Sequence, residues 1–180
     1  MKNFLRAVLK PLSFVPAIVV LYMIFSFSEQ TGAESSQVSL KVSRSIVIAA
    51  DRCLDLNLDP VRAEEIAQEI HYYVRKLGHV TEYFILAVTV SFPLYVYRLR
   101  GIWLVLVAGA FCVAAAALDE YHQSFVAGRG PSVRDVCIDS IGIVIGITVV
   151  RIVCFIGRMT VFRPLSSRRK RNGEDSGPDC

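Results

Sequence analysis

The order of apolar and polar residues divides the chain into four apolar blocks separated by polar connections. The blocks are residues 11–28, 77–97, 101–118 and 136–157. A helix of roughly 17–25 residues crosses a hydrocarbon core of ~30 Å, so each block is long enough to span a bilayer. Because backbone groups in lipid must be hydrogen-bonded within their own segment, each block is predicted to be an α-helix. The predicted fold class is an all-α, polytopic membrane helix bundle with four transmembrane helices.

The connection between the first two blocks, residues 29–76, is polar but has a helical pattern of apolar positions. Asp59 and Pro60 predict the start of a helix, because aspartate is a common N-cap and proline is favoured at the first helical position. We therefore predict two amphipathic helices, the second of which continues into the second span. Their apolar stripes either lie on the membrane surface or pack over the mouth of the bundle. The stripes are Val38, Val42, Ile46 and Ala49 or Ala50, then Ile66, Ile70, Val74 and Leu77.

Composition supports a membrane protein of one domain. The 180 residues are 53% hydrophobic and 20% charged, and the apolar residues are concentrated in blocks, which argues against a soluble enzyme fold and against disorder. We assign residues 1–165 to a single transmembrane domain. Residues 166–180 are polar and charged, and they are predicted to form a disordered basic tail.

Lysine and arginine predict the orientation, since they gather on the cytoplasmic side of spans. They are dense before the first block, between the second and third, and after the fourth, so both termini are expected in the cytoplasm of a multi-pass plasma-membrane protein. The segment 29–76 is then extracytoplasmic. A cleaved signal peptide is an alternative for the first block, because a basic start and an apolar run precede Thr31, Gly32 and Ala33.

With this orientation, the polar residues near the ends of the spans all fall on the outer side of the membrane. Lys76, His79 and Tyr83 share one helix stripe, and Asp135, Asp139 and Gly142 share another. A carboxylate at mid-membrane costs ~2.5–3.5 kcal/mol, so Asp139 requires a polar or cationic partner. Gly142 and Gly146 would let a neighbouring helix approach closely. The candidate site residues are Ser26, Gln30, Lys76, His79, Glu82, Asp119, Glu120, Gln123, Arg129, Arg134, Asp135 and Asp139.

Three functions fit these residues. In the first, Lys76, Arg129 and Arg134 bind an anionic or polar lipid-linked molecule, and Ser26, Gln30, Asp119, Glu120, Gln123 and Asp135 complete the ligand site. In the second, His79, Glu82 and Asp139 act as acid and base on a phospho-substrate, or acidic and histidine side chains hold a divalent cation. In the third, the charges form a structural network in a non-catalytic scaffold. The sequence requires no cofactor and leaves a metal open.

Four sequence blocks, in order, resemble the signatures of VanZ-like membrane proteins, a family named after a teicoplanin-resistance protein. The resemblance implies a bacterial plasma-membrane protein with a cell-envelope role and no established reaction. Implied partners are membrane lipid and a lipid-linked envelope precursor or a glycopeptide, without nucleic acid. Departures are Val80, Ala127 and Asp139, where other members often have an aromatic residue, proline and asparagine. The blocks are Phe25-Ser-Phe-Ser-Glu-Gln30-Thr-Gly32, Val74-Arg-Lys76-Leu-Gly-His79-Val-Thr-Glu82-Tyr83, Leu118-Asp119-Glu120-Tyr-His-Gln123-Ser-Phe-Val-Ala-Gly128-Arg129 and Asp135-Val-Cys-Ile-Asp139-Ser-Ile-Gly142.

Overall fold

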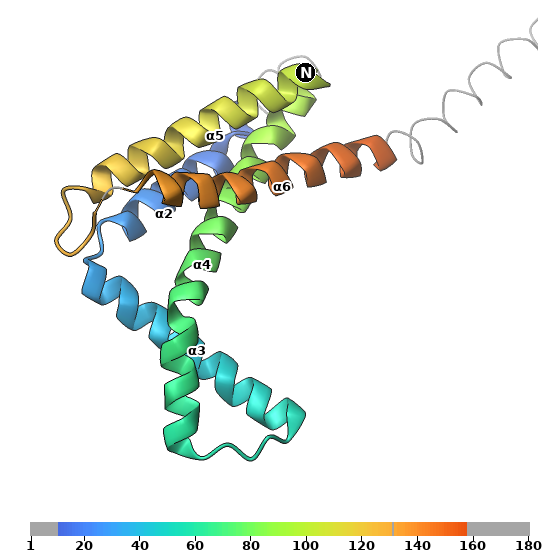
Figure 1. The fold of residues 1–180 in the computed structure, drawn as a ribbon. Helices are drawn as coiled ribbons and strands as arrows, with labels where there is room; N and C mark the ends of the chain where they lie inside the picture. The colour runs from blue at the N-terminus through green and yellow to red at the C-terminus, as the bar shows by residue number, and fades with distance from the viewer. Residues whose placement is uncertain (1–10, 131, 158–180) are drawn as a thin grey trace, which may run out of the picture. The chain divides into compact units, whose positions relative to one another are not determined.

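The computed structural model describes residues 11–130 and 132–157, and this part of the chain is helical without strands. The basic tail predicted at 166–180 lies outside the described residues. The chain divides into two units, Met1–Ile147 and Thr148–Cys180, and the described part of the second unit is the end of the last helix. The helices in chain order are α2 (Val15–Ser28), α3 (Gly32–Leu54), α4 (Pro60–Val96), α5 (Ile102–Gln123) and α6 (Val133–Gly157) (Figure 1).

Three of these helices, α4, α5 and α6, are long and apolar enough to cross a membrane. The helix in the first predicted span, α2, has 14 residues and corresponds to about 21 Å of helix. It qualifies as a span only together with α3, from which it is separated by a bend of 110°. The all-helical, membrane-compatible prediction is therefore confirmed. The predicted arrangement of four separate spans is supported for three of them, and the fourth depends on how α2 and α3 are counted.

Both segments predicted to be amphipathic helices are helical, and local capping explains where these helices begin. At the start of α3, the Thr31 hydroxyl accepts from the Glu34 N–H at 3.2 Å, and the Glu34 carboxylate accepts from the Thr31 N–H at 2.8 Å. At the start of α4, Asp59 accepts from the Val61 N–H at 3.2 Å, and Pro60 occupies the first helical position. As predicted, α4 then continues without interruption into the second apolar block.

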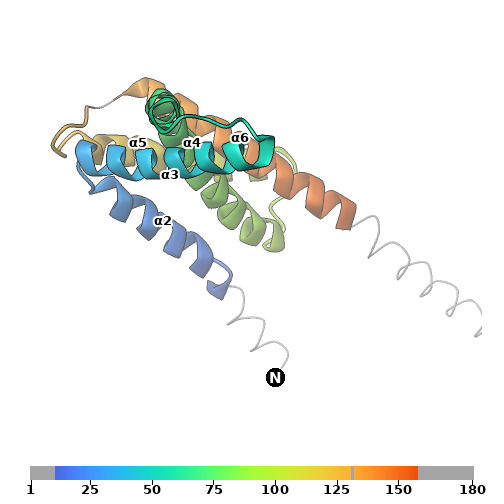
Figure 2. The same cartoon turned by 90° about the horizontal axis from the view of Figure 1, so that it is seen from below.

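The core lies around the second half of α4. Its side chains Tyr83, Leu86, Ala87 and Val90 are buried and pack with residues of α2, α5 and α6. Small residues on the facing side of α5 allow close packing there, because they add little volume between the helix backbones. These α5 residues are Ala108, Cys112, Ala115 and Ala116. Figure 2 shows α4 nearly end-on at its start, with α3 crossing it.

Two glycines of α6 bring this helix against α4. A Cβ atom on Gly142 would lie 3.0 Å from the Val80 carbonyl carbon and closer still to its oxygen. A Cβ atom on Gly146 would lie 2.7 Å from the Phe84 carbonyl oxygen. Both distances are shorter than ordinary van der Waals contact, so only glycine permits this spacing. The predicted close approach at this glycine pair is confirmed, and α4 is the neighbour.

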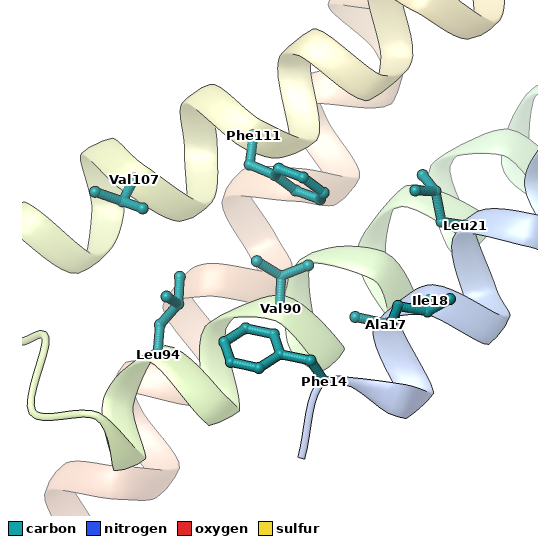
Figure 3. A pocket seen from close by; sticks show the side chains of 8 residues that line it. All are labelled: Phe14, Ala17, Ile18, Leu21, Val90, Leu94, Val107 and Phe111. Atoms are coloured by element: carbon teal, nitrogen blue, oxygen red, sulfur yellow. The ribbon is translucent and has the colours of Figure 1, made fainter. Parts of the chain in front are cut away.

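An apolar cavity of about 180 Å³ lies between α2, α4 and α5 (Figure 3). It is near the first residues of α2 and the last residues of α4, where the Phe14 and Tyr97 rings are 5.7 Å apart. Figure 3 shows Phe14, Val90 and Phe111 around the same space. Since its lining has no polar side chain, this cavity has no group that could bind an anion or transfer a proton. The lining residues are Phe14, Ala17, Ile18, Leu21, Val90, Leu94, Val107 and Phe111.

Candidate functional site

The predicted polar residues include four that are almost completely buried. Asp119 is 3% exposed, Asp139 5%, Gln123 7% and Glu120 8%. Three of them lie in the last turns of α5 and the fourth lies in the second turn of α6, so the helices hold them in place. Burial of charged and polar side chains is costly unless they have partners. The hydrogen-bond and ion-pair partners of these four side chains therefore show which of them are already satisfied within the protein.

Asp119 lies at the centre of a small group of neutral polar side chains. The Gln123 amide donates a hydrogen bond of 2.8 Å to Asp119 Oδ2. The hydroxyl groups of Ser28 and Tyr83 are next to the same carboxyl group, but they do not reach hydrogen-bonding geometry, and Oδ1 has no partner. Tyr83 itself is completely buried in the core. Asp119 is thus held by Gln123 of its own helix, while its other oxygen stays unpaired beside hydroxyl groups of α2 and α4.

Three further predicted residues, Glu120, Lys76 and Asp135, are engaged by contacts within the chain. Glu120 accepts a hydrogen bond of 2.7 Å from the Ser132 N–H, which links the end of α5 to the segment before α6. Lys76 Nζ lies 2.5 Å from Asp135 Oδ2, in an ion pair between α4 and α6. These contacts explain the burial of Glu120 and the position of Asp135 structurally. The Lys76 ammonium group is already paired with a carboxylate.

A cavity of about 280 Å³ lies beside these contacts, between the end of α2, α3, α4 and the loop after α5. We call it the polar cavity. One part of its lining is polar and the other part is apolar, which distinguishes it from the apolar cavity in Figure 3. The lining residues are Phe27, Gln30, Ser35, Val38, Ser39, Val42, Val74, Arg75, Gly78, His79, Glu82 and Arg129.

On the α4 side of the polar cavity, His79 and Glu82 form a contact. His79 Nδ1 lies 3.5 Å from Glu82 Oε2, and the two side chains are 23% and 30% exposed. The carboxyl groups of Asp119 and Asp139 also lie within electrostatic range of the imidazole. His79 and Glu82 therefore share the cavity, while Asp139, the third predicted catalytic residue, is buried and does not line it.

On the loop side, Arg129 brings an unpaired cation to the polar cavity. Its Nε and Nη1 atoms are buried and have no hydrogen-bond partner in the described part of the protein. Burial lowers the pKa of Arg129, and the nearby Arg75 guanidinium lowers the pKa further. The guanidinium group still carries its charge, because arginine is not deprotonated in proteins. An anion with oxygen acceptors would supply the missing partners.

The structure places the other predicted residues differently. Gln30 lines the polar cavity, whereas Ser26 is half-buried and does not line it. Arg134 is exposed at the start of α6. Lys76 also does not line the cavity, so the predicted stripe of Lys76, His79 and Tyr83 divides into an ion pair, a cavity residue and a core residue.

Arg75 is a cavity residue that the sequence analysis did not select. It lies four residues before His79 and seven before Glu82, so all three share one stripe of α4. This spacing was the signal that could have identified it. Among the residues that the structure describes, no three His, Cys, Asp or Glu side chains converge in a way that could hold a metal ion.

The fold and the polar cavity together describe a helical protein compatible with a multi-pass membrane location. Comparison with known families gives the same class: the VanZ/LLP1 family model matches residues 13–155, and the chain belongs to this family. The match covers α2 to α6 almost completely, including every residue that lines the polar cavity. No curated protein matches the chain, and neither does any solved structure.

Proposed function

We propose that this protein binds the anionic headgroup of an amphiphilic, lipid-linked cell-envelope molecule in the polar cavity. The observation that carries this proposal is the buried edge of Arg129, whose Nε and Nη1 atoms have no hydrogen-bond acceptor among the residues that the structure describes. Leaving buried donors unpaired is costly, and a phosphate or carboxylate would satisfy them by bidentate hydrogen bonds. In the predicted orientation, the cavity is at the outer face of the plasma membrane.

The second cation of the cavity strengthens its preference for anions. Arg75 lies close enough to Arg129 for the two guanidinium groups to repel each other. A bound anion relieves this repulsion, because it places negative charge beside both groups. Lys76 cannot do the same at this position, since it is paired with Asp135. We therefore assign anion binding to Arg129 and Arg75, with Gln30 as a polar neighbour.

The apolar part of the lining supports an amphiphile as the ligand instead of a small soluble anion. Phe27, Val38, Val42 and Val74 occupy the same cavity as the two arginines. An alkyl or isoprenoid chain would cover these side chains while its headgroup contacts the guanidinium groups, because apolar surface is stabilised by contact with apolar groups. Lipid-linked envelope precursors combine both features.

Binding is tested with a fluorescent polyisoprenyl phosphate and the purified full chain in detergent. Each hydrogen bond to a charged group contributes ~1.5–3 kcal/mol, so Arg129→Gln should weaken binding by about tenfold or more. Arg134→Gln is the matched control, because Arg134 is a nearby arginine that is exposed outside the cavity. The neutral polyisoprenol with the same chain should bind weakly to every variant.

Equal binding by the Arg129→Gln and Arg134→Gln variants would contradict the proposal. Loss of the folded protein in the Arg129→Gln variant would instead support a structural role for this charge, as in a scaffold. Membership of the VanZ/LLP1 family leads us to propose an effect on glycopeptide tolerance as well, and the same pair of variants tests it in cells. At equal abundance in the membrane, only Arg129→Gln should lower teicoplanin tolerance.

The contact between His79 and Glu82 favours a second function, acid–base catalysis on the bound molecule. The pair lines the cavity that also contains Arg129, so a proton donor and a phosphate-binding group would be adjacent. Incubating the protein with a polyisoprenyl pyrophosphate, with and without divalent metal, tests this function. Release of phosphate that is abolished by Glu82→Gln would support it, and the absence of product under both conditions would reject it.

A further inference from the structure

Helix α3 has an unusual distribution of side chains between its buried and exposed faces. Its buried residues include Ser39 and Ser43, which face α4, where Ala67 is completely buried. The hydroxyl groups need no partner on α4, because Ser39 donates to the Ser36 carbonyl at 3.0 Å and Ser43 donates to the Ser39 carbonyl at 2.9 Å. The buried side of α3 thus contains these two serines together with Gly32 and Val47.

Three apolar residues of α3 form an exposed stripe, whereas Val47 is buried at 5% exposed. Val38 is 53% exposed, Val42 45% and Ile46 46%, and their spacing of four residues places them on one stripe. In water, burial of serine and exposure of valine and isoleucine would reverse the usual preference. An apolar environment around this stripe removes the contradiction.

The remaining face of α3 is polar and carries positive charge. Gln37, Lys41 and Arg52 are exposed on this side of the helix, together with Arg44, which pairs with Glu64 of α4, and the apolar Ile48. A helix with an apolar stripe beside a basic face is suited to the membrane interface, where its apolar side chains enter the acyl region and its cations contact anionic headgroups.

The direction of α3 relative to α2 agrees with a position of α3 in the membrane interface. The chain turns by 110° between the two helices, so a helix following a membrane-crossing segment is directed along the plane of the membrane. The Thr31–Glu34 capping contacts fix the start of α3, and the Gly32 N–H donates to the Ala127 carbonyl at 3.1 Å. Figure 1 shows α3 turning away from α2 and crossing the first half of α4.

We propose that α3 lies in the membrane interface at the end of α2, with Val38, Val42 and Ile46 inserted among lipid acyl chains. The occupant of the exposed stripe is then phospholipid. Val38 and Val42 also line the polar cavity, so the cavity borders directly on the bilayer. This proposal concerns the surface of α3 and does not depend on the anion that Arg129 binds.

The chain has one tryptophan, Trp103, which makes a fluorescence test possible. In a Trp103→Phe background, Val42→Trp reports on the stripe, and Gln37→Trp on the polar face is the matched control. The full chain is reconstituted in vesicles of phosphatidylcholine and phosphatidylglycerol, with or without lipids brominated on the acyl chain. We expect Val42→Trp to be quenched several-fold more strongly than Gln37→Trp.

Equal quenching at the two positions, or stronger quenching at position 37, would overturn the proposal. Protection of position 42 from brominated lipid would also overturn it, and cross-linking of two chains through α3 would then identify a second copy as the occupant. Ile46→Trp provides an independent reporter if the Val42 variant does not fold. Val42 lines the polar cavity but Ile46 does not, so the Ile46→Trp variant gives the result that is independent of the anion site.

Discussion

The contact between α6 and α4 at Gly142 leads to the sharpest stability prediction, because alanine would add a single atom between two helix backbones. That Cβ atom would lie 3.0 Å from the carbonyl carbon of Val80 and 3.1 Å from the nitrogen of Phe84, and closer still to the Val80 oxygen. Backbone atoms cannot move aside by rotating a side chain. Gly142→Ala therefore requires the two helices to separate or shift.

The expected cost follows from two opposing effects. Overpacking costs ~1–3 kcal/mol, and contact with backbone places this variant near the upper end of that range. Alanine is better than glycine inside a helix by ~1 kcal/mol, so the net loss in the free energy of unfolding should be about 2 kcal/mol. Gly109→Ala is the matched control in α5, because its Cβ atom would have its nearest neighbour, Ile147 Cδ1, at an ordinary 3.8 Å.

The measurement is unfolding in mixed micelles as the mole fraction of sodium dodecyl sulfate rises. Gly142→Ala should shift the midpoint to a lower dodecyl sulfate fraction than the unsubstituted protein, and Gly109→Ala should leave it unchanged or raise it. If the two variants unfold at the same midpoint, α6 does not approach α4 at Gly142. The packing described for these helices would then be wrong.

Two other predictions concern capping and ion pairs. Thr31→Ala removes the hydroxyl that caps α3 and should lower the free energy of unfolding by about 1 kcal/mol in the same assay. Unchanged stability would show that the Gly32–Ala127 hydrogen bond alone fixes the start of α3. Double-mutant cycles should give a larger coupling energy for Lys76–Asp135, whose side chains are 20% and 30% exposed, than for Arg44–Glu64, whose side chains are 47% and 37% exposed. A larger coupling energy for Arg44–Glu64 would mean that exposure to solvent does not determine the strength of these ion pairs.

The positions of the helices could be predicted from the sequence more accurately than the division of these helices into membrane spans. The cap at Asp59 and Pro60 and the continuous apolar pattern beyond it were sufficient to predict α4, because both signals are local. The first span was less predictable. Its apolar block suggested a full crossing, but the helix has 14 residues and is followed by a bend of 110°, which is set by contacts between Gly32 and Ala127, far apart in the sequence.

The candidate site could be predicted only as a set of residues near one membrane face. Helix periodicity placed Lys76 and His79 on one stripe, but it could not show that Lys76 pairs with Asp135 while His79 lines the polar cavity. That division depends on which helices lie on each side of α4. The sequence could have placed Arg75 on the stripe of His79 and Glu82, but its proximity to Arg129 in a distant loop is shown only by the structure.

The continuity of α4 has a mechanical consequence. Its first half packs against α3, and Arg75, His79 and Glu82 follow on the same unbroken helix of 37 residues. The start of α3 is also tied to the loop of Arg129, because the Gly32 N–H donates to the Ala127 carbonyl. With α3 in the membrane interface as proposed, a shift of this helix would move both sides of the proposed anion site: the three side chains of α4 and the loop of Arg129.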